Sequence, residues 1–150
     1  MCFKSVGRSV PLNYILLFVF TACEAYSVMY ICAAIGDGSL VATAAFLTAG
    51  IVLALTIYAV TTKRDFTLCG GFIAIMSAAF LMVVIVGFFF GPSFHLFICV
   101  LGVIIFGLYL VYDTQSICGG RNEEIKTDDY IIAAMTLYLD IINIFIYILQ

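Results

Sequence analysis

The sequence predicts an all-α fold, a polytopic bundle of transmembrane helices forming a single domain over residues 1–150. Of the 150 residues, 65% are hydrophobic and only 10% are charged, whereas soluble domains average about 45–50% apolar and about 25% charged residues. A mean hydropathy of +1.24 argues against a disordered chain. The apolar residues also fall into five segments, each of about the 20 residues that a helix needs to cross a bilayer.

Each predicted span is bounded by residues that form turns. Gly36-Asp37-Gly38-Ser39 ends the first span, Thr62-Lys63-Arg64-Asp65 is a charged turn after the second, and Gly91-Pro92-Ser93 follows the third. The longest connection, Thr114–Asp129, separates the fourth span from the fifth. We therefore expect helices over about residues 12–35, 40–61, 68–90, 94–113 and 130–149.

The first span has a second interpretation as a cleaved signal peptide, because Lys4 and Arg8 precede an apolar stretch with small residues near its end. The apolar run continues through Tyr26–Ile35, however, and Glu24 would lie at the cleavage site. A retained span is the better interpretation.

The basic residues predict the orientation of the chain in the membrane. A five-span weave places every Lys and Arg on one side, and the positive-inside rule makes that side cytosolic. We therefore expect a cytosolic N-terminus, with Gln150 on the far side. Six Lys and Arg against nine Asp and Glu argue against a nucleic-acid partner. The basic residues are Lys4, Arg8, Lys63, Arg64, Arg121 and Lys126.

Acidic residues within the spans are the strongest functional signal. A charge at the centre of the bilayer costs about 2.5–3.5 kcal/mol on insertion scales, so each such acid is a candidate functional residue. Glu24 lies in the middle of the first span, Asp140 in the middle of the last, and Asp113 at the end of the fourth. Carboxylates with no Lys or Arg in the spans to offset them favour the passage of cations or protons.

Asp140 has polar neighbours at helical spacing, namely Thr136, Asn143 and Tyr147, which share one face of the last helix. We expect this stripe to face the interior of the bundle. It can supply hydrogen bonds between helices while the acid stays protonated, or it can line a hydrated path that titrates. The second interpretation is the one we favour.

Glu24 likewise has Thr21 and Ser27 near it on the first helix, and we expect this second stripe also to face inward and to support the polar interior. Asp128 and Asp129 precede the last helix, where carboxylates cap free amides and complement the helix dipole. We expect them to act as caps rather than as a calcium site.

A resident metal or cofactor is not expected. The six cysteines contain no C-x-x-C pair, and His95 is the single histidine. Calcium enters the expectations below only as a permeant ion.

Four stretches carry a resemblance to a known family. They are Leu110–Gln115 (LVYDTQ), Asp129–Phe145, Pro11–Tyr14 and Lys63–Thr67. Together they resemble the transmembrane Bax inhibitor motif family, the Lifeguard proteins. That family has seven spans, and this chain matches its third to seventh. We therefore expect a fragment, a partial gene model or a short isoform.

The resemblance implies a pH-sensitive, calcium-permeable leak in the membrane of the endoplasmic reticulum, the Golgi or the cell surface, linked to the suppression of cell death. It also implies that Asp113 and Asp140 match a pH-sensing pair near the cytosolic mouth. In the family, a basic residue of the second span can latch that pair, and no segment of this chain matches that span.

Pairing of the two aspartates places a condition on the fourth helix. A count along the spans puts Asp140 deeper than Asp113 by roughly two turns, about 10 Å. The fourth helix must therefore run past Asp113 or tilt. We expect a pair so formed to share one proton and to titrate as a unit.

Two other functions stay open. One is a membrane regulator that does not transport and acts by binding apoptosis-regulating membrane proteins. The other, more remote, is an intramembrane aspartyl protease, a class that needs Gly-x-Gly-Asp where this chain has Tyr138-Leu139 before Asp140. We therefore expect no enzymatic activity, and the bilayer itself is the partner that the composition requires.

The predicted topology can be tested with glycosylation acceptor sites placed at Gly38 and Gly120. We expect modification at Gly38 only, because that turn is predicted to face the lumen or the cell exterior. Modification at Gly120 would reverse the predicted orientation.

Overall fold

The computed structural model describes residues 11–87, 89–118 and 129–150, and the regular secondary structure of these residues is helical. Five helical segments are long and apolar enough to cross a membrane, which confirms the all-α, five-span prediction. In chain order the elements are α2 (Leu12–Ile35), α3 (Gly38–Thr61), η1 (Phe66–Cys69), α4 (Gly70–Gly87), α5 (Pro92–Cys118) and α6 (Tyr130–Leu149).

The turn between α2 and α3 is shorter than predicted. Gly36 adopts a left-handed conformation, with φ of 71°, and its N–H donates to the carbonyl of Cys32 at 3.2 Å. The carboxylate of Asp37 then accepts from the backbone N–H groups of Ser39 at 2.9 Å and Leu40 at 3.3 Å. Because this cap satisfies the free amides at once, α3 begins at Gly38 rather than near residue 40.

The α3–α4 connection, which we define as Thr62–Asp65, is the predicted charged turn. It leads into the short 3-10 helix η1, where the Asp65 carboxylate accepts from the backbone N–H of Thr67 at 3.1 Å. The third span therefore begins as a 3-10 turn at Phe66, and its α-helix ends at Gly87, short of the predicted residue 90.

The fourth span is longer at both ends than its predicted range of 94–113. Its helix α5 starts at Pro92, which is compatible with the first turn because its missing N–H would have no partner there. It continues to Cys118, and the polar residues Thr114, Gln115 and Ser116 are buried in the bundle rather than exposed in a loop. The condition for pairing of the aspartates, a fourth helix that runs past Asp113, is therefore met.

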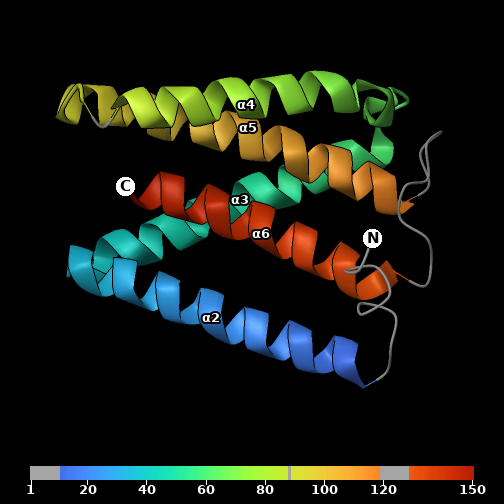
Figure 1. Ribbon diagram of the computed structural model, residues 1–150, viewed down its shortest axis with the longest axis horizontal. Coiled ribbons are helices and arrows are strands. Elements are labelled where there is room, and N and C mark those ends of the chain that lie inside the picture. Colours follow the sequence, from blue (N-terminus) through green and yellow to red (C-terminus); the bar gives the residue numbers. More distant parts are fainter. Residues whose placement is uncertain (1–10, 88, 119–128) are drawn as a thin grey trace.

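The helices pack in an arrangement centred on α5 and α6. In Figure 1, α2 (blue) and α4 (green) lie at opposite edges, α5 and α6 run antiparallel between them, and α3 passes behind. One apolar cluster joins α2, α3 and α6 around Phe145, and a second joins α4, α5 and α6 around Phe80. Since α6 contributes to both clusters, it connects the two sides of the bundle.

The outer faces carry large apolar side chains. Phe18 on α2, Phe46 on α3 and Phe89 after α4 are 76%, 84% and 84% exposed. Soluble monomers rarely expose apolar surface on this scale. Lipid tails are the solvent that accommodates these faces, in agreement with an integral membrane protein.

A glycine allows α5 and α6 to approach closely. A Cβ atom on Gly102 would lie 2.6 Å from Cγ of Tyr147, so the Tyr147 ring rests directly on the backbone of α5. The same ring stacks on Phe106, with centroids 5.7 Å apart, and meets Phe80 edge-on at 5.7 Å. Tyr147 therefore links α4, α5 and α6 through one aromatic group.

We expect Gly102→Ala to lower the free energy of unfolding by about 1–3 kcal/mol, because the added methyl group must displace the Tyr147 ring. Thermal unfolding in detergent measures the change. Gly50→Ala is the matched control, since a Cβ atom there has nothing within 4 Å. That control should stabilise the helix by about 0.5–1 kcal/mol. Equal effects of the two substitutions would contradict the close approach at Gly102.

Candidate functional site

The structure brings Asp113 of α5 and Asp140 of α6 together, although 27 positions separate them in the sequence. Both side chains are buried, with 9% and 5% of their surface exposed. Their carboxyl groups lie within hydrogen-bonding reach of one another. The extension of α5 beyond Asp113 and the antiparallel course of α6 produce this arrangement.

Two carboxyl groups can form a hydrogen bond only if at least one of them holds a proton. The Oδ2 atom of Asp140 is buried and has no hydrogen-bond partner among the described residues. A negative charge on such a buried atom has no donor among the described residues to stabilise it. The arrangement therefore favours one shared proton while α5 and α6 stay together, and it exposes two like charges to each other once that proton leaves.

The other polar residues of the α6 stripe play a local part in the structure. Thr136 and Asn143 are half-buried. The Thr136 hydroxyl donates to the carbonyl of Ile132 at 2.7 Å, and the Asn143 amide donates to that of Leu139 at 2.8 Å. Both bonds stay within α6. The stripe contacts α5 through Asp140 and Tyr147 instead.

The expected stripe around Glu24 is only partly correct. Glu24 is half-buried, on the face of α2 that also carries the half-buried Phe20 and Val28. Thr21 and Ser27 are exposed, and each donates to the carbonyl four residues earlier, at 2.8 and 3.1 Å. The prediction that they face inward is wrong, because a spacing of three residues turns a helix about 60° away from the starting face.

The predicted caps of α6 also differ from the structure. Asp129 stands at the N-cap position, but its side chain makes no cap hydrogen bond. Instead it is buried, with 4% of its surface exposed. The side-chain cap that the sequence indicated at this position is therefore not formed. Asp128 lies outside the described residues.

Gln115 is a residue whose importance the sequence did not reveal. Its Oε1 atom accepts from the backbone N–H of Phe66 at 2.8 Å. Its Nε2 atom donates to the carbonyls of Ala59 at 3.1 Å and Arg64 at 3.0 Å. Because the fourth span was expected to end at Asp113, Gln115 was assigned to a loop. Its place in the LVYDTQ stretch was the one available signal.

A second polar network joins the beginnings of α2 and α6. The Asn13 side chain is 1% exposed, and its amide donates to the Tyr130 hydroxyl at 3.3 Å. The Tyr130 hydroxyl in turn donates to that of Tyr14 at 3.1 Å. This network holds the peripheral helix α2 to the centre of the bundle.

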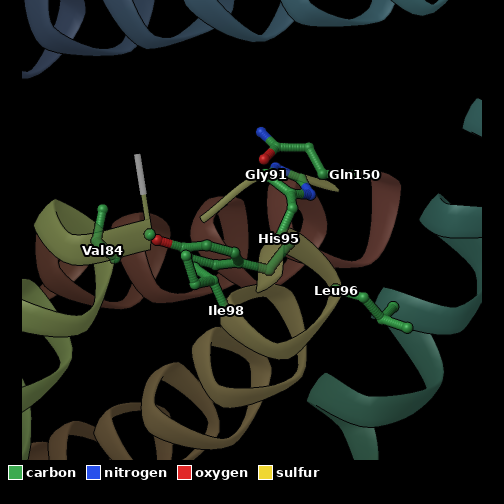
Figure 2. Close-up of a pocket in the computed structure, with 8 residues that line it drawn as sticks. Val84, Gly91, His95, Leu96, Ile98 and Gln150 are labelled. Atoms are coloured by element: carbon green, nitrogen blue, oxygen red, sulfur yellow. The ribbon is translucent and has the colours of Figure 1, made fainter. Parts of the chain in front are cut away.

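Two cavities flank the central helices. The larger, of about 830 Å³, lies near the start of α5 and the end of α6, and its walls include His95, Tyr147 and Gln150. Figure 2 shows the His95 ring beside the Gln150 side chain. This cavity is remote from the carboxyl pair, because His95 precedes Asp113 by about five helical turns on α5.

The smaller cavity, of about 490 Å³, lies between α4 and α5 and is lined by polar groups that include Thr67, Tyr109 and Tyr112. Tyr112 neighbours Asp113 in the chain, so this cavity is the nearer of the two to the carboxyl pair. Within the part of the chain that the structure describes, no group of three or more His, Cys, Asp or Glu could hold a metal ion.

Comparisons with known proteins place the whole chain in one context. A family model described as inhibitor of apoptosis-promoting Bax1 (Bax1-I) matches residues 1–150. The chain is 33% identical over 154 residues to Protein lifeguard 3 of Homo sapiens. This match covers 99% of this chain and 49% of that protein. It is 35% identical over 145 residues to Protein lifeguard 4 of Mus musculus, with coverages of 93% and 57%.

A similar match comes from a third organism. Bax inhibitor 1 of Schizosaccharomyces pombe is 33% identical over 145 residues, which cover 95% of this chain and 52% of that protein. The chain spans about half the length of the curated relatives that it matches.

Glu24 lies on the bundle-facing side of α2, which leads to a test of its role. Glu24→Gln should be mild, because it keeps the size and hydrogen-bonding capacity of the side chain. Glu24→Leu should lower the thermal stability of the chain in detergent, because it removes the acid from the interior. Thr21→Val and Ser27→Ala are matched controls on the exposed side and should be near neutral. Better tolerance of Leu than of Gln would mean that Glu24 faces lipid or solvent.

Proposed function

The chain belongs to the Bax inhibitor family, whose model matches all of its residues, and on this premise we propose that it is a negative regulator of apoptosis that acts as a pH-sensitive, calcium-permeable leak. The compartment that we propose is an intracellular membrane, of the endoplasmic reticulum or Golgi, or the plasma membrane. The N-terminus faces the cytosol in this proposal.

One observation carries the proposal. Asp113 and Asp140 are buried, lie on two different helices, and are close enough to share a hydrogen bond. Intramembrane acids are costly, and acids that face each other can store one proton that governs whether their helices stay together. A pH-dependent contact between α5 and α6 is therefore the simplest role for the pair.

The proposed sequence of states follows from the charges. When one proton is shared, the hydrogen bond ties α5 to α6 and the path is closed. As pH rises the proton is lost, and two like charges in a medium of low dielectric constant repel each other. The helices then part and present two carboxylates, which are the oxygen ligands that calcium prefers. At still lower pH both acids are protonated, and their attraction for calcium falls.

The polar surroundings support an ion path at this end of the bundle. Thr67, Tyr109 and Tyr112 line a cavity beside the segment of α5 that carries Asp113. No Lys or Arg occurs within α5 or α6 to oppose a cation. Both features favour calcium or protons over anions.

A second candidate function is regulation by protein partners without transport. It is favoured by the description of the matching family, which refers to inhibition of an apoptosis-promoting protein. Survival assays distinguish the two. Aspartate variants without flux should lose protection if transport is the function, and should keep protection if binding to other membrane proteins is the function.

The direct test is calcium flux from proteoliposomes that contain the chain, measured between about pH 5 and 8. We expect flux of the unmodified chain to increase from low to neutral pH. Asp113→Asn and Asp140→Asn should each remove most of this dependence. The double variant should add little to either single change, because the two groups act as one.

Asp37→Asn is the matched control for these variants. Asp37 is exposed and caps α3, and asparagine caps a helix about as well as aspartate. It should leave both the fold and the pH profile unchanged. If Asp113→Asn and Asp140→Asn each keep the profile of the unmodified chain, the pair is not the sensor.

A further inference from the structure

The geometry points to Gln115 as a positioning residue that couples the Asp113–Asp140 pair to the α3–α4 connection, so that the pair and the connection lock and release together. This inference rests on the proposed function for the site, but its main measurement does not require calcium flux. The hydrogen bonds of the Gln115 side chain go to backbone groups of other segments and not to either carboxyl group. Gln115 therefore acts on the pair through the backbone of α5.

The first step is what the Gln115 side chain does for the connection. The carbonyl of Ala59 belongs to the last turn of α3, and the N–H of Phe66 belongs to the first residue of η1. Such groups have no partner within their own helices. One carboxamide offers two donor hydrogens and one acceptor oxygen, and Gln115 uses them on these two groups and on the carbonyl of Arg64. It therefore caps the end of one helix and the start of the next at once.

The second step is the mechanical link to the aspartates. Gln115 follows Asp113 by two residues in the same continuous helix. The side chains from Asp113 to Ser116 are all buried, with 9% or less of their surface exposed. This part of α5 is therefore enclosed on several sides, towards α6 at Asp113 and towards α3 at Gln115. A movement of α5 that parts Asp113 from Asp140 must either break the Gln115 hydrogen bonds or carry the connection with it.

The third step is reciprocity. If release of the carboxyl pair disfavours the Gln115 bonds, loss of those bonds must favour release of the pair by the same free energy. The connection carries Lys63 and Arg64, both exposed, so its release would also move two positive charges at this end of the bundle. The Gln115 lock therefore favours the closed, proton-sharing state.

The pH dependence is assigned to the aspartate pair rather than to Gln115, which does not titrate. Other titratable or charged side chains lie on the elements around this segment, except on α4, which carries none, and each is a control position for the assignment. On the described residues they are Tyr58, Lys63, Arg64, Asp65 and Cys69 on α3, the connection and η1; Tyr109, Tyr112 and Cys118 on α5; Asp129, Tyr130 and Tyr138 on α6; and Tyr14 and Glu24 on α2.

The test is hydrogen–deuterium exchange at the amide of Phe66, measured in detergent and corrected for the intrinsic pH dependence of exchange. We expect strong protection at low pH, where the pair shares a proton, and a loss of protection as pH rises. Asp140→Asn should remove this pH dependence, although Asp140 belongs to a different helix from both Phe66 and Gln115. Protection of Phe66 that is independent of pH in the unmodified chain would overturn the coupling.

Variants at Gln115 test the reciprocal effect. Gln115→Met keeps the approximate length of the side chain but removes both Nε2 donors and the Oε1 acceptor without adding a titratable group. It should lower protection at Phe66 at every pH, and it should move the midpoint of the flux profile to lower pH by about half to one unit. Gln115→Asn, which is shorter, should shift both quantities in the same direction. Unchanged midpoints in both folded variants would overturn the inference.

Ser116→Ala is the matched control. Ser116 is the next residue, is 2% exposed, and its hydroxyl has no hydrogen-bond partner among the residues that the structure describes. Its removal should change neither Phe66 protection nor the flux midpoint. Should it reproduce the effects of Gln115→Met, general loosening of α5 would replace the specific lock as the explanation.

The two proposals fail in different ways. Phe66 protection that depends on pH in a chain without calcium flux would support the coupling and contradict the leak. Flux that depends on the aspartates, with Phe66 protection independent of pH, would support the leak and contradict the coupling.

Discussion

The antiparallel packing of α5 against α6 is the contact on which the rest of the structure depends. At one end of this contact Gly102 lets the Tyr147 ring rest on the backbone of α5. Nearer the other end, Asp113 meets Asp140. Between helices that are already surrounded by apolar solvent, the hydrophobic effect contributes little, so close van der Waals packing and polar contacts decide which faces meet. The α5–α6 contact supplies both kinds of interaction along one line.

Polar groups inside the bilayer need hydrogen-bond partners within the protein, because no water is available there. The chain supplies these partners in two ways. Most Ser and Thr hydroxyl groups of the spans donate to the carbonyl four residues earlier and need no other helix. Examples are Thr21, Thr48 and Thr136. A smaller set reaches across the bundle, with Gln115 and Asn13 as the main examples. The hydrogen bonds of this second set fix the positions of the helices relative to one another. A movement of one helix against another would therefore break or rearrange them.

The aspartate pair is an exception, because one of its buried oxygen atoms has no hydrogen-bond partner among the described residues. An oxygen of Asp140 is buried with no partner in the described part of the chain, beside a second carboxyl group. Natural membrane proteins keep such an arrangement only where it serves a purpose, since an apolar residue of similar size would cost less. The chain belongs to the Bax inhibitor family and spans about half the length of the relatives that it matches.

The sequence by itself determined the class, the number of spans and five of their ten ends. Apolar length and turn residues are local properties, and the ranges of α2 and α6 were predicted to the residue because Gly36 and the acidic residues before Tyr130 interrupt the apolar pattern. The two acids that meet at the α5–α6 contact were also visible in the sequence, because an acid within an apolar span is conspicuous whatever the fold.

Only the tertiary structure decided what depends on neighbouring helices. The end of α5 moved beyond Asp113 because the polar residues that follow are buried against other helices and are no longer loop-like. The same burial gave Gln115 its three partners, one each at the end of α3, in the α3–α4 connection and at the start of η1. Asp129 is also buried and makes no side-chain cap bond. Thr21 is exposed because the orientation of α2 about its own axis, set by its packing, places Glu24 on the inner face of the helix. Some polar residues at helix ends, such as Asp37, cap their own helix, and others, such as Gln115, bind another segment. The local sequence does not distinguish the two, because the second kind depends on a partner that only the tertiary structure supplies.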